Sequence, residues 1–465
     1  MPLETFKLTK FRFIELLLFV VESRISALPD HPYKKDYNLH TQNAVFDLFL
    51  TFMQSQKIKT TLCIIGAGPA GATASIFLCK MGIKHMIIDA AVFPRDKVCG
   101  DGLDLNSIRV LNHIDPTIIE KELSVNKKHF TASQGFRFIL PGGRKVDIMR
   151  DQKKDDHVNK PVFFVSKRAD FDNLLVSRID RNIADVRLST RIENITREAK
   201  TWKLEGEGPD GKIEIETDFL IGADGDHSVV LKYLGERSID RNNYAGAVRQ
   251  YWSGVQGMHP GNLLEVYFPK SLPLSYFWIF PLPGGKANVG YGMASNYIAK
   301  HNINVRKAFE ELIKNDPVLT PRFKNAQPQE TVKGWGIPMS GNDRKAYGDG
   351  WLLLGDAASL VCPTSGEGIG SGMISAYVAS KFLKRAIDQN DFSEKMFSNY
   401  NREIHKRLRT EEKVYRFVNS IPPKVFSLGI NTILSTWLFK YWLSNKAMKK
   451  WVDTAYNKEI DVKLT

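Results

Sequence analysis

The clearest hydrophobic pattern in the chain lies between residues 61 and 90. Residues 62–65 form a short apolar run that suits a parallel strand buried on both faces, and residues 76–81 continue an apolar, alanine-rich helix. A second apolar strand is expected at residues 86–88. The order strand, helix, strand predicts a βαβ unit.

Three glycines stand in the turn between this first strand and the helix. Gly66 allows the tight turn, Gly68 lets the backbone approach a pyrophosphate, and Gly71 lets the helix pack closely on the strand. Pro69 suits the first helical turn, where its missing N–H costs nothing. The helix N-terminus favours an anion, and Asp89 after the second strand can accept hydrogen bonds from a ribose hydroxyl. Together these features predict a dinucleotide site, whereas the glycines alone would also suit an ordinary tight turn.

Two further buried strands run into turns of the same kind. The strand ending at residue 222 leads to Asp224, and the strand at residues 351–354 leads to Asp356. A glycine-rich loop follows Asp356, and then a helix is expected over residues 368–381. A helix N-terminus next to an acidic strand end indicates a site for an anion or polar group. The alternative for Asp224 is a β-turn in which the side chain caps its own backbone.

The pattern changes to strict alternation between residues 244 and 293, which predicts an antiparallel sheet. Its expected strands are residues 247–255, 263–268, 275–281 and 287–293. Tyr276, Trp278 and Phe280 occupy alternate positions of one strand, so all three project from the same face. They form either an aromatic wall or part of an ordinary core.

Composition adds two constraints. The formal net charge of +14 would suit a phosphate-bearing or acidic lipid partner, or would only aid solubility. No nucleic-acid-binding module is present, so nucleic acid is not an expected partner. The cysteines, Cys63, Cys79, Cys99 and Cys362, show neither paired nor zinc-ligand spacing, which predicts a reducing cytoplasm and no metal site.

The three strand-end turns carry a family resemblance. Their sequences, Gly-Ala-Gly-Pro-Ala-Gly at 66–71, Gly-Ala-Asp-Gly at 222–225 and Gly-Asp-Ala-Ala at 355–358, resemble the FAD fingerprints of glutathione-reductase-type, hydroxylase-like flavoproteins. The segments 93–100 and 166–172 and the motif Pro-x-x-Tyr-x-Trp-x-Phe-Pro at 273–281 more narrowly resemble the geranylgeranyl reductase family. The resemblance covers roughly residues 57–383, and the W-x-W-x-I-P motif expected of halogenases is absent.

The resemblance implies FAD as the cofactor and assigns roles to individual residues. Asp89 would bind the adenosine ribose, Asp356 the ribityl-phosphate part, and Ile192 the adenine region through its backbone. The helix beginning at Gly368 and Ile369 would stabilise negative charge on the reduced flavin pyrimidine. The full implied set is Gly66, Gly68, Ala70, Gly71, Asp89, Cys99, Gly100, Arg168, Ile192, Asp224, Asp356, Gly368 and Ile369. Where relatives usually carry Arg after the Ser-Val-Val segment, this chain has Leu231 and Lys232, so the contact of that arginine is not carried over.

The function implied is an FAD-dependent oxidoreductase that passes a hydride to a C=C bond of a prenyl lipid. Tyr276, Trp278 and Phe280 would line the prenyl site and stabilise positive charge developing on carbon. Cys99 and Tyr276 are candidate proton donors only through their nearness to the inferred flavin. NAD(P)H, a ferredoxin or another reductant would all fit as electron donor. The alternatives are a flavin monooxygenase acting on an aromatic or lipid-like substrate, and a non-catalytic prenyl carrier.

The predicted architecture is α/β, with a Rossmann-like FAD-binding domain, an inserted antiparallel-sheet substrate domain and a helical C-terminal segment. The FAD-binding domain is expected at residues 58–128, 158–235 and 328–385, and the substrate domain at 129–157 and 236–327. Residues 1–57 form an extension, and we hypothesise that Met53 is the functional start. The C-terminal segment is 386–465, and the sequence specifies no oligomeric state.

The C-terminal segment bears on location. Residues 392–415 are expected to form one charged helix, and residues 424–451 mix large apolar side chains with lysines as interfacial helices do. A helix capping the substrate tunnel is the alternative for 424–451. We therefore expect a cytoplasmic protein, either free or peripheral on the inner face of a membrane.

Overall fold

The computed structural model describes residues 56–149, 160–236, 238–272, 275–341, 344–406, 408–421 and 448–464. The N-terminal extension up to residue 55, the Met53 start and nearly all of the interfacial segment lie outside these ranges. So does Pro273, the first residue of the prenyl-reductase motif. None of those predictions is tested by the structure.

The first domain is built on a mostly parallel sheet around β1 (Gln56–Ile65). In the sheet, β1 lies between β11 (Gly211–Gly222) and β2 (His85–Ile88), and all three run parallel. β8 (Ala184–Arg187) extends the sheet beyond β2, and β19 (Trp351–Leu353) extends it beyond β11. The last four residues of β1 are buried, as expected for a central parallel strand covered on both faces. The antiparallel strands β9 (Arg191–Glu198), β10 (Thr201–Gly208) and β18 (Tyr347–Gly348) complete it.

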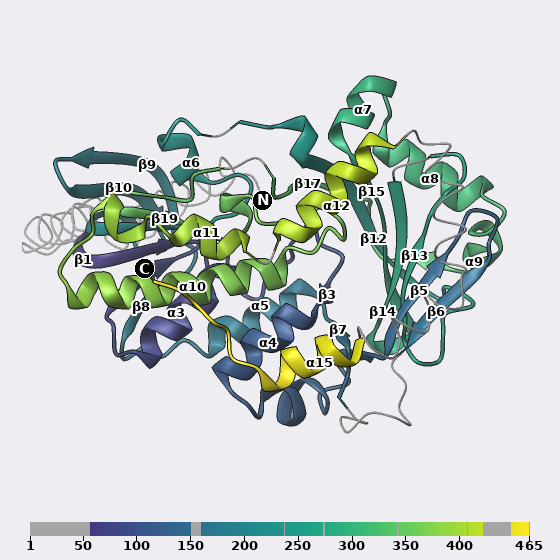
Figure 1. Cartoon of the computed structure of the whole chain (residues 1–465), viewed down its shortest axis with the longest axis horizontal. Coiled ribbons are helices and arrows are strands. Elements are labelled where there is room, and N and C mark those ends of the chain that lie inside the picture. The colour runs from purple at the N-terminus through teal and green to yellow at the C-terminus, as the bar shows by residue number, and fades with distance from the viewer. Residues whose placement is uncertain are drawn as a thin grey trace, which may run out of the picture.

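Helices cover this sheet (Figure 1). The helix α3 (Pro69–Lys80), which follows β1, packs against the long helix α10 (Ile369–Asp388). Both helices are rich in small residues where they meet. A Cβ placed on Gly372 of α10 would lie 3.5 Å from the Cβ of Ala70 in α3. The helix α4 (Leu105–Ile114) packs against α10, and α5 (Arg168–Ser177) packs against α3. The short helix α6 (Val229–Tyr233) packs on β9 and β11. A small separate sheet is formed by β3 (Gly102–Leu103), β7 (Phe163–Val165) and β4 (Thr131–Ser133).

The second domain is an antiparallel sheet at the other end of the molecule (Figure 1). Its central strands are β12 (Tyr244–Ser253), β15 (Lys286–Ala294), β14 (Ser275–Leu282) and β13 (Leu264–Tyr267). β13 pairs in parallel with β5 (Gly135–Ile139), which forms a hairpin with β6 (Lys145–Met149). The helices α7 (Ser295–His301), α8 (Val305–Asn315) and α9 (Thr320–Phe323) follow β15, and Phe309 of α8 packs on Phe277 of β14. The predicted α/β class and inserted antiparallel sheet are confirmed.

One predicted boundary is displaced. Residues 328–385 were expected in the first domain, yet β16 (Gln327–Pro328) and β17 (Lys333–Pro338) both pair with β12 in the antiparallel sheet. The chain therefore returns to the first domain only after β17. The other predicted domain boundaries stay predictions.

The single charged helix predicted for residues 392–415 is wrong. The chain instead forms η5 (Glu394–Phe397), α11 (Tyr400–His405) and α12 (Arg409–Ser420). Tyr400 explains the break, because its ring is fully buried and its hydroxyl donates to the carbonyl of Leu353 at 2.9 Å. The last helix, α15 (Met448–Asn457), packs against α4. Among the described residues, no helix is both long and apolar enough to cross a membrane.

Candidate active site

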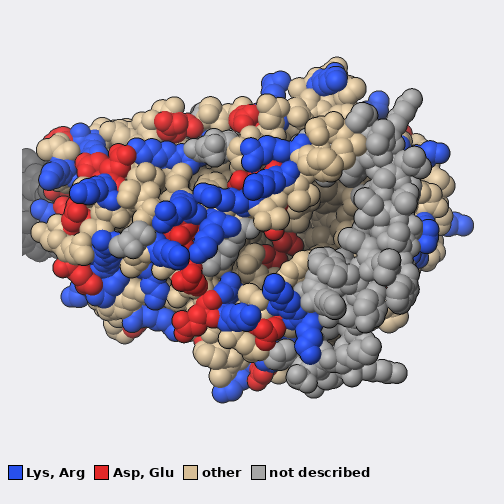
Figure 2. Space-filling model, viewed as in Figure 1, with Lys and Arg blue, Asp and Glu red and all other residues tan. Residues whose placement is uncertain are grey.

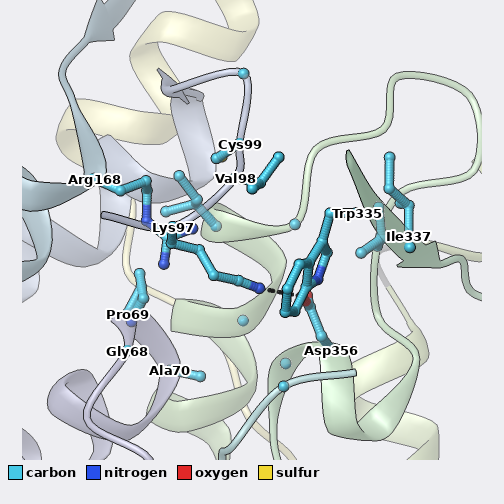
Figure 3. A pocket seen from close by; sticks show the side chains of 18 of the residues that line it. Gly68, Pro69, Ala70, Lys97, Val98, Cys99, Arg168, Trp335, Ile337 and Asp356 are labelled. Carbon is cyan, nitrogen blue, oxygen red and sulfur yellow. Dashed lines mark ion pairs between the residues drawn. The ribbon is translucent and has the colours of Figure 1, made fainter. Parts of the chain in front are cut away.

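A cavity of about 340 Å³ lies where the carboxyl ends of the parallel strands meet the antiparallel sheet. Its walls come from the start of α3, the loop after β2, the turn after β11, the loop before α10, and strands β12, β14 and β17. Figure 3 shows Pro69 and Ala70 at the start of α3 on one side, and Trp335 and Ile337 of β17 on the other. This is the position in which open α/β sheets bind their ligands.

Most of the predicted cofactor residues lie at this cavity. The lining includes Gly68, Ala70, Asp89, Cys99, Gly100, Arg168, Asp224, Asp356, Gly368 and Ile369. Gly66 and Gly71 shape the turn behind it, and Ile192 does not line it. Ile192 is buried in β9, two residues after Thr190, whose backbone N–H donates to the carbonyl of Asp89. Leu231 is buried and Lys232 is exposed, and neither lines the cavity.

The glycine turn after β1 has room for backbone only. A Cβ on Gly71 would lie 1.8 Å from the carbonyl oxygen of Gly66, and a Cβ on Gly66 would lie 2.3 Å from that of Ala223. Gly66 also has a φ of +103°, a backbone angle that residues other than glycine rarely adopt. The following helix begins at Pro69 without a side-chain cap, so its first N–H groups face the cavity. This cradle fits the diphosphate of a dinucleotide such as FAD.

Asp89 is held by two backbone groups. Its Oδ2 accepts a hydrogen bond from the N–H of Ala67 at 2.7 Å, and its Oδ1 accepts one from the N–H of Ala91 at 2.8 Å. A carboxylate oxygen has a second lone pair, so both oxygens can still accept from ribose hydroxyls. The carboxylate therefore both closes the glycine turn and faces the cavity.

The other two acidic strand ends differ from one another. Asp224 Oδ2 accepts from the N–H of Val229 at 2.7 Å, while its buried Oδ1 has no partner within the described part of the chain. Burial is the main cause that raises the pKa of Asp224 to about 6. Asp356 lies 4.0 Å from the ammonium of Lys97, which reaches across the cavity and over the ring of Trp335 at 4.3 Å (Figure 3). The unpartnered buried oxygen of Asp224 and the half-buried cation of Lys97 are polar groups that a bound cofactor would satisfy.

The guanidinium of Arg168, which the family resemblance assigns to cofactor contact, is already bound to a carboxylate of the protein. It makes two hydrogen bonds to Asp172, at 2.7 and 2.8 Å, and Arg95 contacts the same carboxylate at 2.9 Å. Cys99, which interacts with Arg168, has a pKa raised chiefly by burial, so its thiol keeps its proton. Asp172 and Arg95 thus hold Arg168 beside the loop that carries Cys99.

A buried polar network joins that loop to the antiparallel sheet. Asn288 Nδ2 donates to the carbonyl of Cys99 at 2.7 Å and to Asp101 Oδ2 at 2.8 Å, and Tyr251 Oη donates to the same Asp101 oxygen at 2.8 Å. Burial is the main cause that raises the pKa of Asp101 to about 6. Sequence reasoning missed these residues. The available signal was the presence of polar side chains such as Arg249 and Asn288 within otherwise apolar strands.

The aromatic row lies against this loop. Tyr276, Trp278 and Phe280 follow one another along one face of β14, with ring centroids 5.8 and 6.4 Å apart. Trp278 lines the cavity, and a Cβ on Gly100 would lie 3.4 Å from the Phe280 ring. Tyr276 points its hydroxyl at the loop before α10, where it donates to the carbonyl of Ser365 at 3.2 Å. Of the three predicted aromatic residues, Trp278 alone lines the cavity, and Tyr276 and Phe280 flank it on the same face of β14.

Comparison of the sequence with known protein families identifies the family to which the chain belongs. The family described as FAD binding domain matches residues 59–413, and the chain belongs to it. It is a flavoprotein of the FAD-binding class, and FAD as the predicted cofactor is confirmed. The digeranylgeranylglycerophospholipid reductase of Methanococcus vannielii is 26% identical over 368 residues, covering 79% of this chain and 86% of that protein. The menaquinone reductase of Mycobacterium tuberculosis is 29% identical over 326 residues, covering 69% and 75%.

Solved structures agree with this assignment at the level of the fold. A geranylgeranyl bacteriochlorophyll reductase-like protein from Thermoplasma acidophilum superposes with a TM-score of 0.71 at 23% identity, covering 86% of this chain and 98% of that chain. The resemblance to the geranylgeranyl reductase family is confirmed.

Proposed function

We propose that this protein is an FAD-dependent reductase that saturates C=C bonds of a prenyl lipid. The observation that carries the proposal is the aromatic row of β14, in which Trp278 lines the FAD cavity and Phe280 lies next to Gly100 in the loop after β2. FAD, when bound and reduced, supplies the hydride. Two relatives are named as reductases of digeranylgeranylglycerophospholipid and of menaquinone, and both of these substrates carry prenyl chains. The names therefore support a prenyl lipid as the substrate class.

The chain's own residues supply the surroundings for that chemistry. An unactivated alkene develops partial positive charge on carbon as it is protonated, and the faces of Tyr276 and Trp278 can stabilise such charge. Asn288 accepts a hydrogen bond from the Trp278 indole and so fixes the ring beside the cavity. The N-terminus of α10 stabilises negative charge on the reduced cofactor.

The experiment is anaerobic mixing of the dithionite-reduced holoenzyme with a geranylgeranylated glycerophospholipid. We expect one C=C bond to be lost for each flavin reoxidised, as measured by absorbance and mass spectrometry of the lipid. A monooxygenase would instead leave the alkene intact and give a hydroxylated product only with oxygen. A prenyl carrier would bind the lipid without reoxidising the flavin.

We propose in addition that the protein binds an anionic membrane surface near α12 and α15. Val414 and Phe417 of α12 and Trp451 of α15 are exposed large apolar side chains, 46, 67 and 45% accessible. Exposed basic residues accompany them, namely Lys413, Arg416, Lys449 and Lys450. Figure 2 shows Lys and Arg side chains spread over much of the face that carries α10 to α12. Apolar side chains flanked by lysine and arginine suit the boundary of an acidic bilayer.

Vesicle co-sedimentation tests this second proposal. We expect binding to vesicles containing phosphatidylserine, weaker binding to phosphatidylcholine alone, and a loss with Phe417→Ser. Lys345→Ser, which removes an exposed cation paired with Glu394, is the control. Equal binding of the wild type to both kinds of vesicle, or none to either, would overturn the proposal.

A further inference from the structure

The face of the antiparallel sheet that meets the cavity carries small residues between two sets of aromatic rings. Tyr276 of β14 lies opposite Gly292 of β15, which in turn lies opposite Ala247 of β12. Ala247 lies opposite Trp335 of β17. Residues directly opposite one another in antiparallel strands project from the same face of the sheet. Tyr276 and Trp335 therefore share one face, with only Gly292 and Ala247 between them.

The neighbouring row on this face explains how the Trp278 indole lies. Trp278 is opposite Gly290 of β15, and a Cβ on Gly290 would lie 2.0 Å from the Trp278 ring. The indole therefore lies across β15, which only glycine at position 290 permits. A Cβ on Gly292 would lie 3.8 Å from the same ring and 3.6 Å from the Cβ of Ala247, so it would fit there without a clash.

These residues bound a trough, which we define as the space over Ala247 between the indoles of Trp335 and Trp278. All three residues line the cavity. The strands β17 and β15 pair with opposite edges of β12, so they lie about 9–10 Å apart. A hydrocarbon chain between two apolar surfaces needs about 7–8 Å, twice a carbon–carbon contact of about 3.5–4.0 Å. The trough therefore has the width of one chain.

Trp335 is the wall of the trough on the side of β17, and groups from the first domain hold its indole. The ammonium of Lys97 lies 4.3 Å from the ring centroid, and the ring of His227 meets the indole edge-on at 5.0 Å. Figure 3 shows the indole projecting into the cavity beside Lys97. A cation already placed over Trp335 leaves Trp278 as the better ring to stabilise positive charge on carbon. Trp335 is thus suited to bounding the chain.

Two buried donors at the cavity have no partner within the described residues, namely Arg249 Nε and Trp335 Nε1. Arg249 is 0% exposed, lies opposite Gly290 on the same face and lines the cavity. Buried donors are almost always satisfied, so the cavity is built to hold a bound molecule. Arg249 makes its side of the trough polar, which suits the cofactor. The opposite side, where Ala245 pairs with Ile337, is apolar and suits a hydrocarbon chain.

We propose that the prenyl chain of the substrate lies in this trough, and that Trp335 and Ala247 set the width of the chain that it admits. This inference rests on the proposed function and names two specificity-determining residues for it. A prenyl chain is flat at each C=C bond and carries a methyl branch on every isoprene unit. The two indoles offer flat walls for the C=C bonds, and the small side chain of Ala247 leaves room for the branches.

The test compares Trp335→Ala, Trp335→Phe and Ala247→Leu with the wild-type holoenzyme at saturating FAD. The oxidised holoenzyme is titrated with a geranylgeranylated glycerophospholipid and followed by flavin absorbance, which gives the dissociation constant of the lipid without turnover. Truncating a large aromatic contact commonly costs about 10-fold in affinity, so we expect that rise for Trp335→Ala. Trp335→Phe should recover part of it. Ala247→Leu overfills the floor and should weaken binding by about 10-fold or more.

Controls separate binding of the chain from damage to the cofactor site. Flavin content, and the rate at which oxygen reoxidises the reduced flavin, should be unchanged in all three variants because neither needs the lipid. Ala299→Leu makes the same change at an exposed position of α7 and should bind the lipid as the wild type does. The wild type should bind a lipid with straight oleoyl chains more weakly than the prenyl lipid, and Trp335→Ala should reduce that preference.

The outcomes distinguish this inference from the proposed function. Prenyl-lipid binding that is as tight in Trp335→Ala and Ala247→Leu as in the wild type would overturn the inference and leave the proposed reduction standing. Loss of flavin from Trp335→Ala at saturating FAD would also overturn it, because the indole would then serve the cofactor. A wild type that binds the lipid through these residues without reducing it would overturn the proposed function alone.

Discussion

Trp278 Nε1 donates a hydrogen bond to Asn288 Oδ1 at 2.9 Å, across the paired strands β14 and β15. The other end of the same amide donates to the carbonyl of Cys99 in the loop beside the cofactor site. One buried side chain thus sets the position of the aromatic row relative to the loop that carries Cys99. Asn288, which is fully buried, therefore couples the antiparallel sheet to the first domain.

Asn288→Ala should destabilise the protein and slow alkene reduction together. The change leaves the Trp278 N–H and the Cys99 carbonyl buried without this partner, and an unsatisfied buried group costs about 1–3 kcal/mol. We expect the free energy of unfolding in urea to fall by about 2 kcal/mol or more. Asn194→Ala, whose amide contacts Glu205 on the exposed hairpin, is the control. Equal effects of the two changes would show that the Asn288 bridge contributes little.

Gly71→Ala should abolish FAD binding. The added methyl would lie 1.8 Å from the Gly66 carbonyl oxygen, so the helix α3 must move away from the turn that cradles the diphosphate. The flavin absorbance of the purified protein measures this directly. Gly82→Ala is the control, because nothing lies within 4 Å of the added methyl and only a positive φ of 69° is strained, at about 1 kcal/mol. A yellow Gly71→Ala protein would contradict the geometry.

Lys97→Met should weaken FAD binding while leaving the fold intact. Lys97 is the cation that reaches into the cavity between Asp356 and Trp335, and burial lowers its pKa. Removing it leaves the Asp356 carboxylate unbalanced next to an anionic cofactor. We expect the dissociation constant of FAD to rise about 10-fold, equivalent to about 1.4 kcal/mol, in a titration of apoprotein. Lys345→Met is the control and should leave the dissociation constant of FAD unchanged.

The pH dependence of stability should reveal Asp101. Its folded pKa of about 6 lies above its usual 3.8, so the stability it contributes is complete below pH 3.8 and is lost as pH rises through 6. Asp101→Asn should therefore gain up to about 3 kcal/mol relative to wild type between pH 4 and 7. Asp147→Asn should behave oppositely, because a hydrogen bond from Arg137 lowers the pKa of Asp147. A flat difference for Asp101→Asn would mean that Asp101 is ionised without cost.

The sequence was sufficient to predict that most of the proposed cofactor residues lie at one place. The turns at Gly66, Asp224 and Asp356 are each specified by a few consecutive residues, so a short motif is enough to predict them. The alternation of Tyr276, Trp278 and Phe280 likewise predicted that they share a face, as they do.

The buried network could not be predicted in the same way. Cys99 and Asn288 are 189 residues apart, and their contact depends on how two domains meet. The interruption of the predicted helix 392–415 near Tyr400 could not be predicted from the charge pattern. It depends on the burial of the Tyr400 ring beside Leu353, which is a contact between distant parts of the chain.

Single-turnover mixing of the reduced holoenzyme with a geranylgeranylated glycerophospholipid, in the absence of oxygen, tests prenyl-lipid reduction most directly. We expect the flavin to be reoxidised as the alkene is saturated, with one double bond lost for each flavin. Flavin that stays reduced with this lipid, or that is reoxidised only by oxygen with a hydroxylated product, would contradict it.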